Sequence, residues 1–405
     1  MMMKSKRGSS SVFLMVILAA LISIVMALIY SVRAESVASR VDAVASLAGD
    51  SVMSEFDRDV QREYGLFMIK GADDEMEAKL RRYIGCSLRD MKDVDVEKVK
   101  ISVSRFSTAN TDLIKAQILE YMKLAVAEDG FTPGRDDTET DDAEDIAQCR
   151  TLRHGPTSVS LPSVALPDKS LTSAAEAIAG KLGEVDRAFE AGTETYMIDS
   201  YILSKFNSRS RMTDREHFFR NEVEYILGGE LSDRKNEKRV ELALKAMRFP
   251  LNLAHIYKDP EKRAATLAMA ELLTPGAAAA ATQAALAATW AYAESDNDVE
   301  LLWQGRKVPM VKDKASWAID LDSAVEGIFG GTVVPAEEKG YDYGQYLQIL
   351  LFFKDENIKL SRILDLIQIN MRASYDGDFL MGEYATGIDV DIRVNGRDYS
   401  YEKKY

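Results

Sequence analysis

Residues 12–32 read VFLMVILAALISIVMALIYSV and contain no charged side chain. A helix of this length, at about 1.5 Å per residue, spans about 30 Å, the thickness of the hydrocarbon core of a bilayer. A cleavable secretory signal is the competing interpretation, but its apolar core is usually about 7–15 residues long and precedes a small-residue cleavage site. Residues 31–35, SVRAE, offer no convincing site of that kind. The stretch therefore predicts a retained transmembrane helix at residues 12–32.

The charges on either side of this stretch predict its orientation. Lys4, Lys6 and Arg7 precede it, whereas Arg33 follows it and is balanced by Glu35. The positive-inside rule then places residues 1–11 in the cytoplasm as a short basic leader. We expect a single-pass protein of the cell membrane with the bulk of the chain extracellular.

The helical pattern does not stop at the end of the apolar stretch. Apolar side chains continue at three- and four-residue steps, with charged residues between them. These positions are Val37, Val41, Val44, Ala48 and Val52. They predict one helix from Val12 to about Asp59, with one half in lipid and the other packed outside.

The rest of the region 33–128 is predicted to be mixed. Tyr64-Gly65-Leu66-Phe67 interrupts the first helix, and helical patterns return at residues 73–84 and 111–127. Between them, Val99, Ile101 and Val103 alternate with polar residues, which indicates a half-buried strand.

Residues 129–168 have a different composition. Seven of the ten residues 136–145 are acidic, and four of the nine prolines lie between Phe131 and Asp168. Such a segment buries too little apolar area to order itself, so it is predicted to be a flexible linker. A calcium site is the alternative, but the acidic run lacks the glycine and the ligand spacing of an EF-hand loop.

The two cysteines, Cys86 and Cys149, are too few for a disulfide framework and lack the spacing of a metal site. In an extracellular domain they would either form one disulfide bond or remain two inert thiols. Both alternatives stay open at this stage.

Residues 169–405 are predicted to form a helical domain. Glycines and prolines suggest the helix ends, with Gly228-Gly229 and Pro250 as stops and Pro260 and Pro275 as starts. The predicted helices span residues 172–191, 214–227, 233–247, 261–273, 276–293 and 341–371. The alanine-rich helix 276–293 is too weakly apolar for a second membrane span, so we expect a closely packed core helix.

The C-terminus carries the clearest hairpin signal. Residues 388–394 alternate apolar and polar, Asn395-Gly396 suits a type I′ turn, and Tyr399 and Tyr401 return. This register places Ile392 opposite Tyr399, Val390 opposite Tyr401 and Arg393 opposite Asp398. We expect an α+β, mostly helical fold, in which the hairpin joins residues 98–104 in a small antiparallel sheet backed by the long helix.

The net charge of −14 argues against nucleic acid as a partner and against peripheral docking on anionic lipid. The sequence contains no nucleophile elbow, phosphate-binding glycine loop or dinucleotide fingerprint. His154, His217 and His255 have no second histidine at metal-ligand spacing. The aromatic residues of 341–353 either line a binding groove or pack in the core, with packing favoured. We therefore predict no catalytic residue, no metal, no cofactor and no enzymatic activity.

Several segments together resemble the DUF5702 family of anchored Firmicutes proteins, which is found beside genes for Tad/Flp-type pili. They are residues 8–14 (GSSSVFL), 63–67 (EYGLF), 221–229 (NEVEYILGG), 290–295 (WAYAES), 307–309 (KVP) and 365–371 (DLIQINM). The family has no known activity, so the resemblance implies no catalytic residue.

The N-terminus is also similar to the TadE/TadG pseudopilins, with a basic leader, Gly8 and an apolar helix that continues outward. This resemblance implies leader-peptidase cleavage between Gly8 and Ser9. Pilins usually carry glutamate five residues after the glycine, where this chain has Phe13. That departure puts both processing and incorporation into a filament in doubt.

Three functions remain to be compared. A structural or accessory component of a Tad-like pilus or secretion assembly agrees best with the long helix and the resemblance. A ligand-sensing extracellular domain is the alternative, although about eleven cytoplasmic residues are too few for an output domain. An anchored hydrolase lacks any motif.

Overall fold

The computed structural model describes residues 7–91, 94–129, 160–163, 167, 169–213, 217–327, 334 and 339–405. The fold is mostly helical with small antiparallel sheets, as the sequence predicts. It divides into two compact units. Unit 1 comprises Met1–Asp57, Met68–Ser107 and Glu383–Tyr405, and unit 2 comprises Arg58–Phe67 and Thr108–Gly382.

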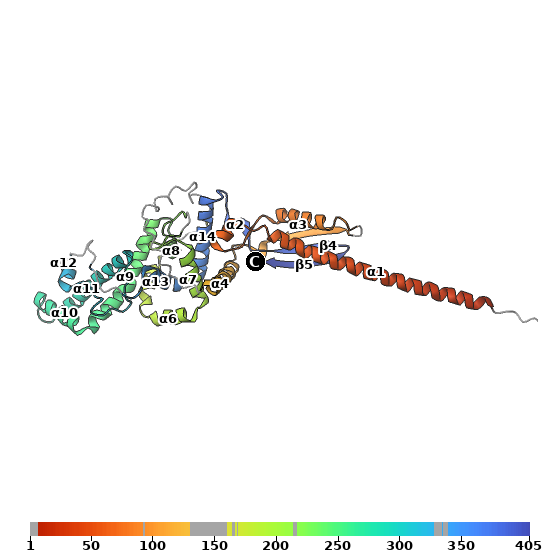
Figure 1. Cartoon of the computed structure of the whole chain (residues 1–405). Helices are drawn as coiled ribbons and strands as arrows, with labels where there is room; N and C mark the ends of the chain where they lie inside the picture. Colours follow the sequence, from red (N-terminus) through yellow and green to blue (C-terminus); the bar gives the residue numbers. More distant parts are fainter. Residues whose placement is uncertain are drawn as a thin grey trace, which may run out of the picture. The chain divides into compact units, whose positions relative to one another are not determined.

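Unit 1 consists of one very long helix, a short helix and the strands (Figure 1). Helix α1 runs unbroken for 47 residues, which is about 70 Å. Its partners are α3 (Asp73–Ser87) and a three-stranded sheet of order β2-β4-β5. The bounds are α1 Arg7–Met53, β2 Val96–Ser102, β4 Gly387–Val394 and β5 Arg397–Lys404, with a second pair of short strands, β1 Ile69–Lys70 and β3 Tyr384–Ala385.

The helix continues past the apolar stretch but ends at Met53 rather than near Asp59. The backbone N–H of Asp57 donates to the carbonyl oxygen of Met68, so the chain turns to pair with a later segment instead of extending the helix. In the C-terminal half of α1 the buried side chains are Val41, Ala45, Ala48, Val52 and Met53. Their three- and four-residue spacing places them on one face, so the predicted amphipathic half is confirmed.

The sheet confirms the predicted register. Ile392 lies opposite Tyr399, Val390 opposite Tyr401 and Arg393 opposite Asp398. The turn residues Asn395 and Gly396 have φ angles of 49° and 74°, the left-handed conformation that a type I′ turn requires. On the other edge β4 pairs with β2, so strands nearly 300 residues apart in sequence are neighbours.

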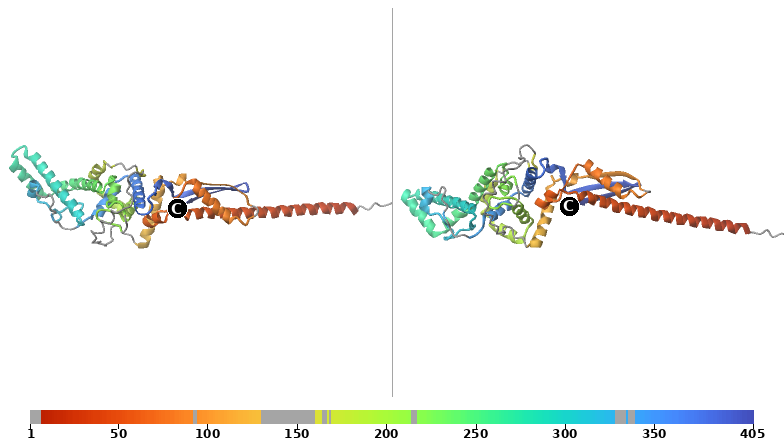
Figure 2. Two further views of the ribbon diagram at one scale, coloured as in Figure 1. Left: turned by 90° about the horizontal axis from the view of Figure 1, so that it is seen from above. Right: turned by 45° about the horizontal axis from the view of Figure 1, so that its top comes forward.

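Unit 2 is helical, and it is coloured from orange to blue in Figures 1 and 2. Its α-helices are α2 Arg58–Tyr64, α4 Thr111–Asp129, α5 Leu171–Ile178, α6 Leu182–Ala191, α7 Glu194–Lys205, α8 Glu222–Gly228, α9 Asp233–Lys258, α10 Pro260–Leu273, α11 Ala279–Trp303, α12 Leu321–Glu326, α13 Tyr343–Phe352 and α14 Glu356–Ser374. Helix α9 packs against α5, α8, α10 and α11. Helix α10 starts at Pro260, as predicted, and the side chain of Asp259 caps it by accepting from the N–H groups of Glu261 and Lys262.

Several predicted helices differ from those observed. The segment 172–191 is two helices, because Gly180 and Lys181 form tight turns back to Ala177 and Ile178. In the segment 214–227, the described residues 217–221 are not helical, and α8 begins at Glu222. Before it, the N–H groups of Arg220 and Asn221 donate to the carboxylate of Asp233 rather than to a helix.

The third difference concerns Pro250, which does not end a helix but lies inside α9. A proline removes one backbone donor and usually kinks or breaks a helix. Here the adjacent residues Arg248 and Asn252 are both buried and hydrogen-bonded to Asp298 of α11. This packing holds the helix together across the proline.

The segment 341–371, predicted as one helix, is two helices, α13 and α14, because the chain turns at Lys354, whose N–H donates to Leu351, and Asp355 then caps α14. Helix α11 begins and ends later than predicted, from Ala279 to Trp303. Its second half is largely buried, whereas much of its alanine-rich first turns is exposed. The acidic run 136–145, Cys149 and His154 lie outside the described residues, so the linker and the disulfide stay predictions. Cys86 is exposed in α3.

Candidate functional site

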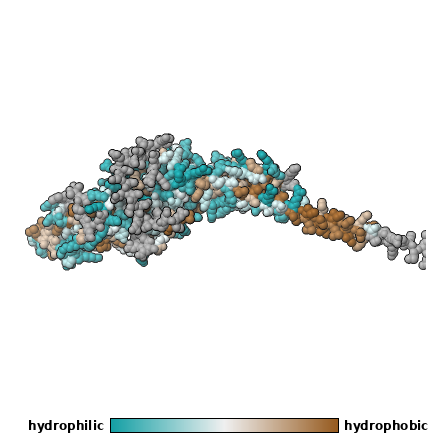
Figure 3. Space-filling model, viewed as in Figure 1, coloured by the Kyte–Doolittle hydropathy of each residue, from teal (hydrophilic) through white to brown (hydrophobic). Residues whose placement is uncertain are grey.

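The first half of α1 is apolar and exposed. Its most apolar window of 18 residues has no buried residue, so it is not a core helix of the fold. Figure 3 shows it as a brown segment that continues beyond the teal surface of the sheet. Within the described residues it is the one helix with the length and composition to cross a membrane. These features are those of a membrane anchor or a signal sequence.

Strand β5 follows the second half of α1 for its whole length. Alternate residues of the strand reach successive turns of the helix, and the two elements run side by side in both figures of the fold. Arg397 donates to Glu35 at 2.7 Å, Tyr401 to Asp42 at 2.5 Å, Lys403 to Ser46 at 2.9 Å, and Tyr405 to the carbonyl oxygen of Met53.

The lengths of the two elements match. Eighteen residues of helix, from Glu35 to Met53, rise about 27 Å, and eight strand steps, from Arg397 to Tyr405, rise about 26 Å. The contacts of Arg397, Tyr401, Lys403 and Tyr405 are therefore spread along the helix, and the hairpin is attached to α1 over the length of the strand.

A groove of about 500 Å³ lies where the hairpin turn meets α1. Its helical wall consists mostly of small apolar residues, with one tyrosine and one arginine, and its other wall is formed by the hairpin turn and the strand ends beside it. The lining residues are Tyr30, Arg33, Ala34, Val37, Ala38, Val41, Val394, Asn395, Arg397 and Tyr399. The groove begins two residues before the end of the apolar stretch 12–32, so it marks the point where the stretch enters the folded part.

An ion pair between Arg397 and Glu35 lies beside the groove and holds Arg397 in place. The guanidinium of Arg397 holds the pKa of the exposed Glu35 carboxyl below its ordinary value, mainly through their hydrogen bond. The pair therefore stays charged at neutral pH. Arg397 is positioned at the rim by this contact, while Arg33 belongs to the opposite, helical wall.

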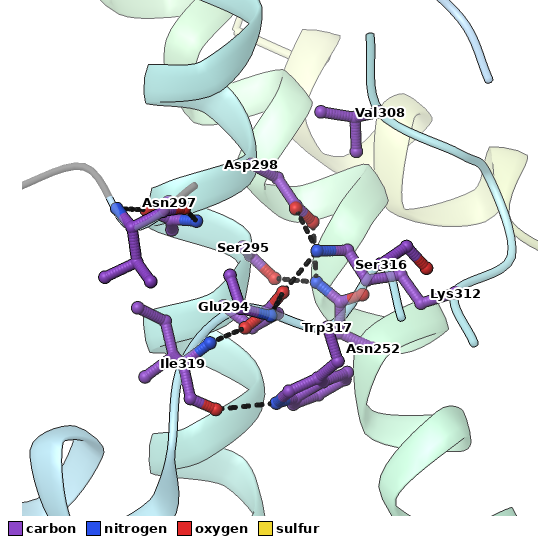
Figure 4. Close-up of polar contacts among 12 residues, drawn as sticks. Asn252, Glu294, Ser295, Asn297, Asp298, Val308, Lys312, Ser316, Trp317 and Ile319 are labelled. Atoms are coloured by element: carbon purple, nitrogen blue, oxygen red, sulfur yellow. Dashed lines mark hydrogen bonds and ion pairs between the residues drawn. The ribbon is translucent and has the colours of Figure 1, made fainter. Parts of the chain in front are cut away.

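A second notable region, within unit 2, is a buried cluster of charges (Figure 4). Lys312 Nζ lies 2.5 Å from Asp298 Oδ1 and also contacts Glu294. Arg248 Nε lies 3.0 Å from Asp298 Oδ2, and all four side chains are almost completely buried. Two cations thus neutralise two carboxylates in the absence of water.

Backbone groups complete this cluster. The N–H groups of Ala318 and Ile319 donate to Glu294 at 3.0 and 2.7 Å. Arg248 donates to the carbonyl oxygen of Met310 at 2.7 Å. Burial raises the pKa of Glu294, whereas Arg248 and Lys312 outweigh burial and lower the pKa of Asp298. The contacts fasten the segment that follows α11 onto α9 and α11.

A third polar centre surrounds the start of α8. His217 Nδ1 lies 2.5 Å from Glu222 Oε2, and Asn370 donates to Glu222 Oε1 at 2.6 Å and to the hydroxyl of Tyr64 at 3.1 Å. His217 also stacks on Tyr64. The histidine and the glutamate are buried, so this dyad has the geometry of a base and its carboxylate partner but no exposure to a substrate.

Neighbouring buried carboxyls have unusual acidities. Burial raises the pKa of Glu224 to about 7, although Tyr343 and the N–H of Arg209 donate to it. Burial likewise raises the pKa of Asp199 to about 6 against the attraction of Lys359. Both acids lie between packed helices, which points to a structural rather than a chemical role.

The sequence does not identify these centres beforehand. One signal in the sequence could have indicated them. Glu222, Glu224 and Asp365 are acids next to large apolar residues, and an acid in such a run is expected to be buried with a partner. The segments that carry the family resemblance supply many of them, namely Glu222, Glu224, Tyr225, Glu294, Asp365 and Asn370. Tyr343 and Tyr346 of the aromatic segment are buried, in agreement with core packing.

The predicted site residues are not brought together. Gly8 and Ser9 lie in the first turns of α1, and Cys86 lies in α3. His217 precedes α8, and His255 in α9 stacks on Trp317. Among the described residues, no group of three or more histidine, cysteine, aspartate or glutamate side chains has the geometry to hold a metal ion.

A family model described as a family of unknown function (DUF5702) matches residues 150–396. The match includes most of unit 2 and strand β4, whereas α1 and the resembling segments 8–14 and 63–67 lie outside it. No curated protein matches the chain, and no solved structure matches it.

Proposed function

The chain belongs to the DUF5702 family of unknown function, and we propose that it is a non-enzymatic, membrane-anchored structural or accessory component of a Tad/Flp-type pilus or secretion assembly. In this proposal α1 is retained as a single span, residues 1–11 are cytoplasmic, and both units are extracellular.

The observation that carries the proposal is the division of α1 into two halves with different surroundings. Residues 12–32 expose an unbroken apolar surface, and the half after Val37 is packed by its inner face onto β4 and β5. A cleaved signal sequence would be separated from the folded part, whereas here the apolar stretch and the half that packs on the sheet form one unbroken helix. A helix shared between membrane and folded domain also agrees with the TadE/TadG-like arrangement.

The outer face of the packed half supplies a surface for assembly. Arg40, Ala43 and Leu47 are exposed on α1, and Leu47 is 63% exposed. Because these residues are exposed, a neighbouring helix of an assembly can pack there.

The test begins with purification of the intact chain from membranes of its own host. Alkaline extraction should leave it in the membrane pellet, and protease added outside intact cells should digest both units. The proposal is supported if the pilus ATPase or platform proteins are recovered with the wild-type chain and with Leu272→Asp but not with Leu47→Asp. Leu272 is a leucine on α10 that is 82% exposed, more than Leu47, and it serves as the control.

Other results contradict the proposal. Release of the chain by alkali excludes a retained anchor. Recovery without assembly proteins but with a bound small molecule favours the sensing alternative. N-terminal sequencing of the mature chain separates two forms of the proposal, because a start at Ser9 indicates a processed pseudopilin and an intact Met1 indicates an anchored accessory protein.

A further inference from the structure

We infer that the groove between α1 and the β4–β5 turn binds the phosphate-bearing headgroup of a membrane phospholipid. This inference rests on the retained span of the proposed function and adds a specific ligand site to it. The three arguments concern the position of the groove, the chemistry of its walls and its size.

The groove lies at the depth of the lipid headgroups. If residues 12–32 fill the hydrocarbon core, Arg33 lies about 1.5 Å and Val37 about 8 Å beyond its edge. The headgroup layer occupies about 5–8 Å on each side of the core. Arg397 reaches the same level, because it contacts Glu35. The groove therefore opens into the layer that contains the phosphates.

The walls carry groups that suit a phosphate. Arg33 lies on the helical wall and Arg397 on the hairpin wall, and guanidinium groups bind phosphate oxygens through paired hydrogen bonds. None of the ten lining residues is acidic, and Arg397, which donates to Glu35 beside the groove, has further N–H groups to offer a phosphate. Tyr30 and Tyr399 add aromatic rings with polar ends, which favour the membrane–water interface.

The rest of the lining suits the glycerol and the upper acyl carbons. Ala34, Val37, Ala38 and Val394 add small apolar side chains to the lining. A volume of about 500 Å³ falls within the range of small-molecule sites, about 300–1,000 Å³. The net charge of −14 opposes broad adsorption to anionic lipid, but it does not prevent two local cations from holding one phosphate.

The experiment uses the full chain, delipidated in a neutral detergent and titrated with phosphatidylglycerol while native mass spectrometry counts bound lipid. Four proteins are compared: the wild type, a double variant Arg33→Gln with Arg397→Gln, a groove-filling variant Ala38→Trp, and the control Arg40→Gln. Arg40 is an exposed arginine of α1 outside the lining. Circular dichroism and thermal melting verify that each variant is folded.

We expect the wild type and Arg40→Gln to retain one lipid with similar affinity. The double variant and Ala38→Trp should bind at least about tenfold more weakly, since the loss of one charge-assisted hydrogen bond alone costs about that factor. Equal loss in Arg40→Gln would indicate non-specific charge attraction and overturn the inference. So would unchanged binding in both groove variants.

Two further outcomes identify a different occupant. Full competition by inorganic phosphate at the same concentration would assign the site to a free anion. A dimer that only Ala38→Trp abolishes, with lipid binding unaffected, would assign the groove to a second copy of the chain. Either result overturns the lipid assignment. Alkaline extraction of the wild type distinguishes failure of this inference from failure of the proposed function. If the chain resists extraction but binds no lipid, the lipid site is wrong and the proposed anchor stands.

Discussion

Lys312 illustrates how much a single buried charge contributes to this fold. Its ammonium group lies between Glu294 and Asp298, all excluded from water. Removal of one partner from a buried ion cluster leaves an uncompensated charge, which is far more costly than the pair itself. We expect Lys312→Met to lower the free energy of unfolding by about 3–5 kcal/mol, measured by urea denaturation of the full chain in detergent.

The neighbouring residue Lys314 provides the control. It forms a 2.8 Å ion pair with Glu261, but both side chains are about three-quarters exposed. Exposed pairs contribute about 0–1 kcal/mol because water and salt screen them. Lys314→Met should therefore change stability by less than about 1 kcal/mol. Similar losses in the two variants would show that the buried cluster has no special role.

Glu224 predicts a pH dependence. Its folded-state pKa of about 7 lies above the ordinary value of 4.5, so the folded chain keeps a proton that the unfolded chain releases in this window. The free energy of unfolding should therefore fall as pH rises from 4.5 to 7, by on the order of 3 kcal/mol from this group. Glu224→Gln should flatten the fall, leaving the smaller contribution of Asp199. A variant with the same pH profile as the wild type would refute the assignment.

Single residues also show where sequence reasoning reaches its limit. The cross-strand pairs of the hairpin were predictable, because a two-residue turn fixes every partner by counting. The partners of Glu222 were not, since His217 is near in sequence but Asn370 lies in α14. A buried acid in an apolar run can be recognised from sequence, whereas the group that neutralises it cannot.

At the scale of elements, α1 allows a direct test of its two faces. Val41 is buried against the sheet, and Leu47 is exposed on the other side. Val41→Asp places an unpaired charge in the core and should lower the free energy of unfolding by about 3 kcal/mol. Leu47→Asp should change it by less than about 0.5 kcal/mol. Thermal melting of both full-length variants measures the difference, and an unchanged melting temperature for Val41→Asp would show that this half is only a stalk.

Other elements show how tertiary contacts override local rules. Pro250 is a helix breaker by its chemistry, yet α9 continues through it because Arg248 and Asn252 are bound to α11. Residues before Glu222 have helical periodicity, yet their N–H groups are taken by Asp233 and Asn370. In both cases a distant hydrogen-bond partner is stronger than the local preference.

At the scale of the whole molecule, unit 1 is assembled from the two ends of the chain. Strand β2 pairs with β4, and β5 extends along α1, so residues near 40 and near 400 form one core. The family match begins at residue 150 and therefore excludes α1 and β2. Strand β4 lies inside the match, but its partner strand β2 lies outside it. The apolar half of α1, which we propose as the anchor, lies outside the matched region.

The sequence by itself determined the long helix, its two halves and the hairpin with its register. Each follows from local information, since an uncharged stretch, a three-to-four-residue period and an Asn-Gly turn depend only on near neighbours. The tertiary structure alone decided which charges meet inside unit 2, where α9 and α8 truly end or begin, and that the β4–β5 turn closes a groove against Arg33. These features depend on residues brought together from distant positions, and the burial that makes their pairing strong exists only after the chain has folded.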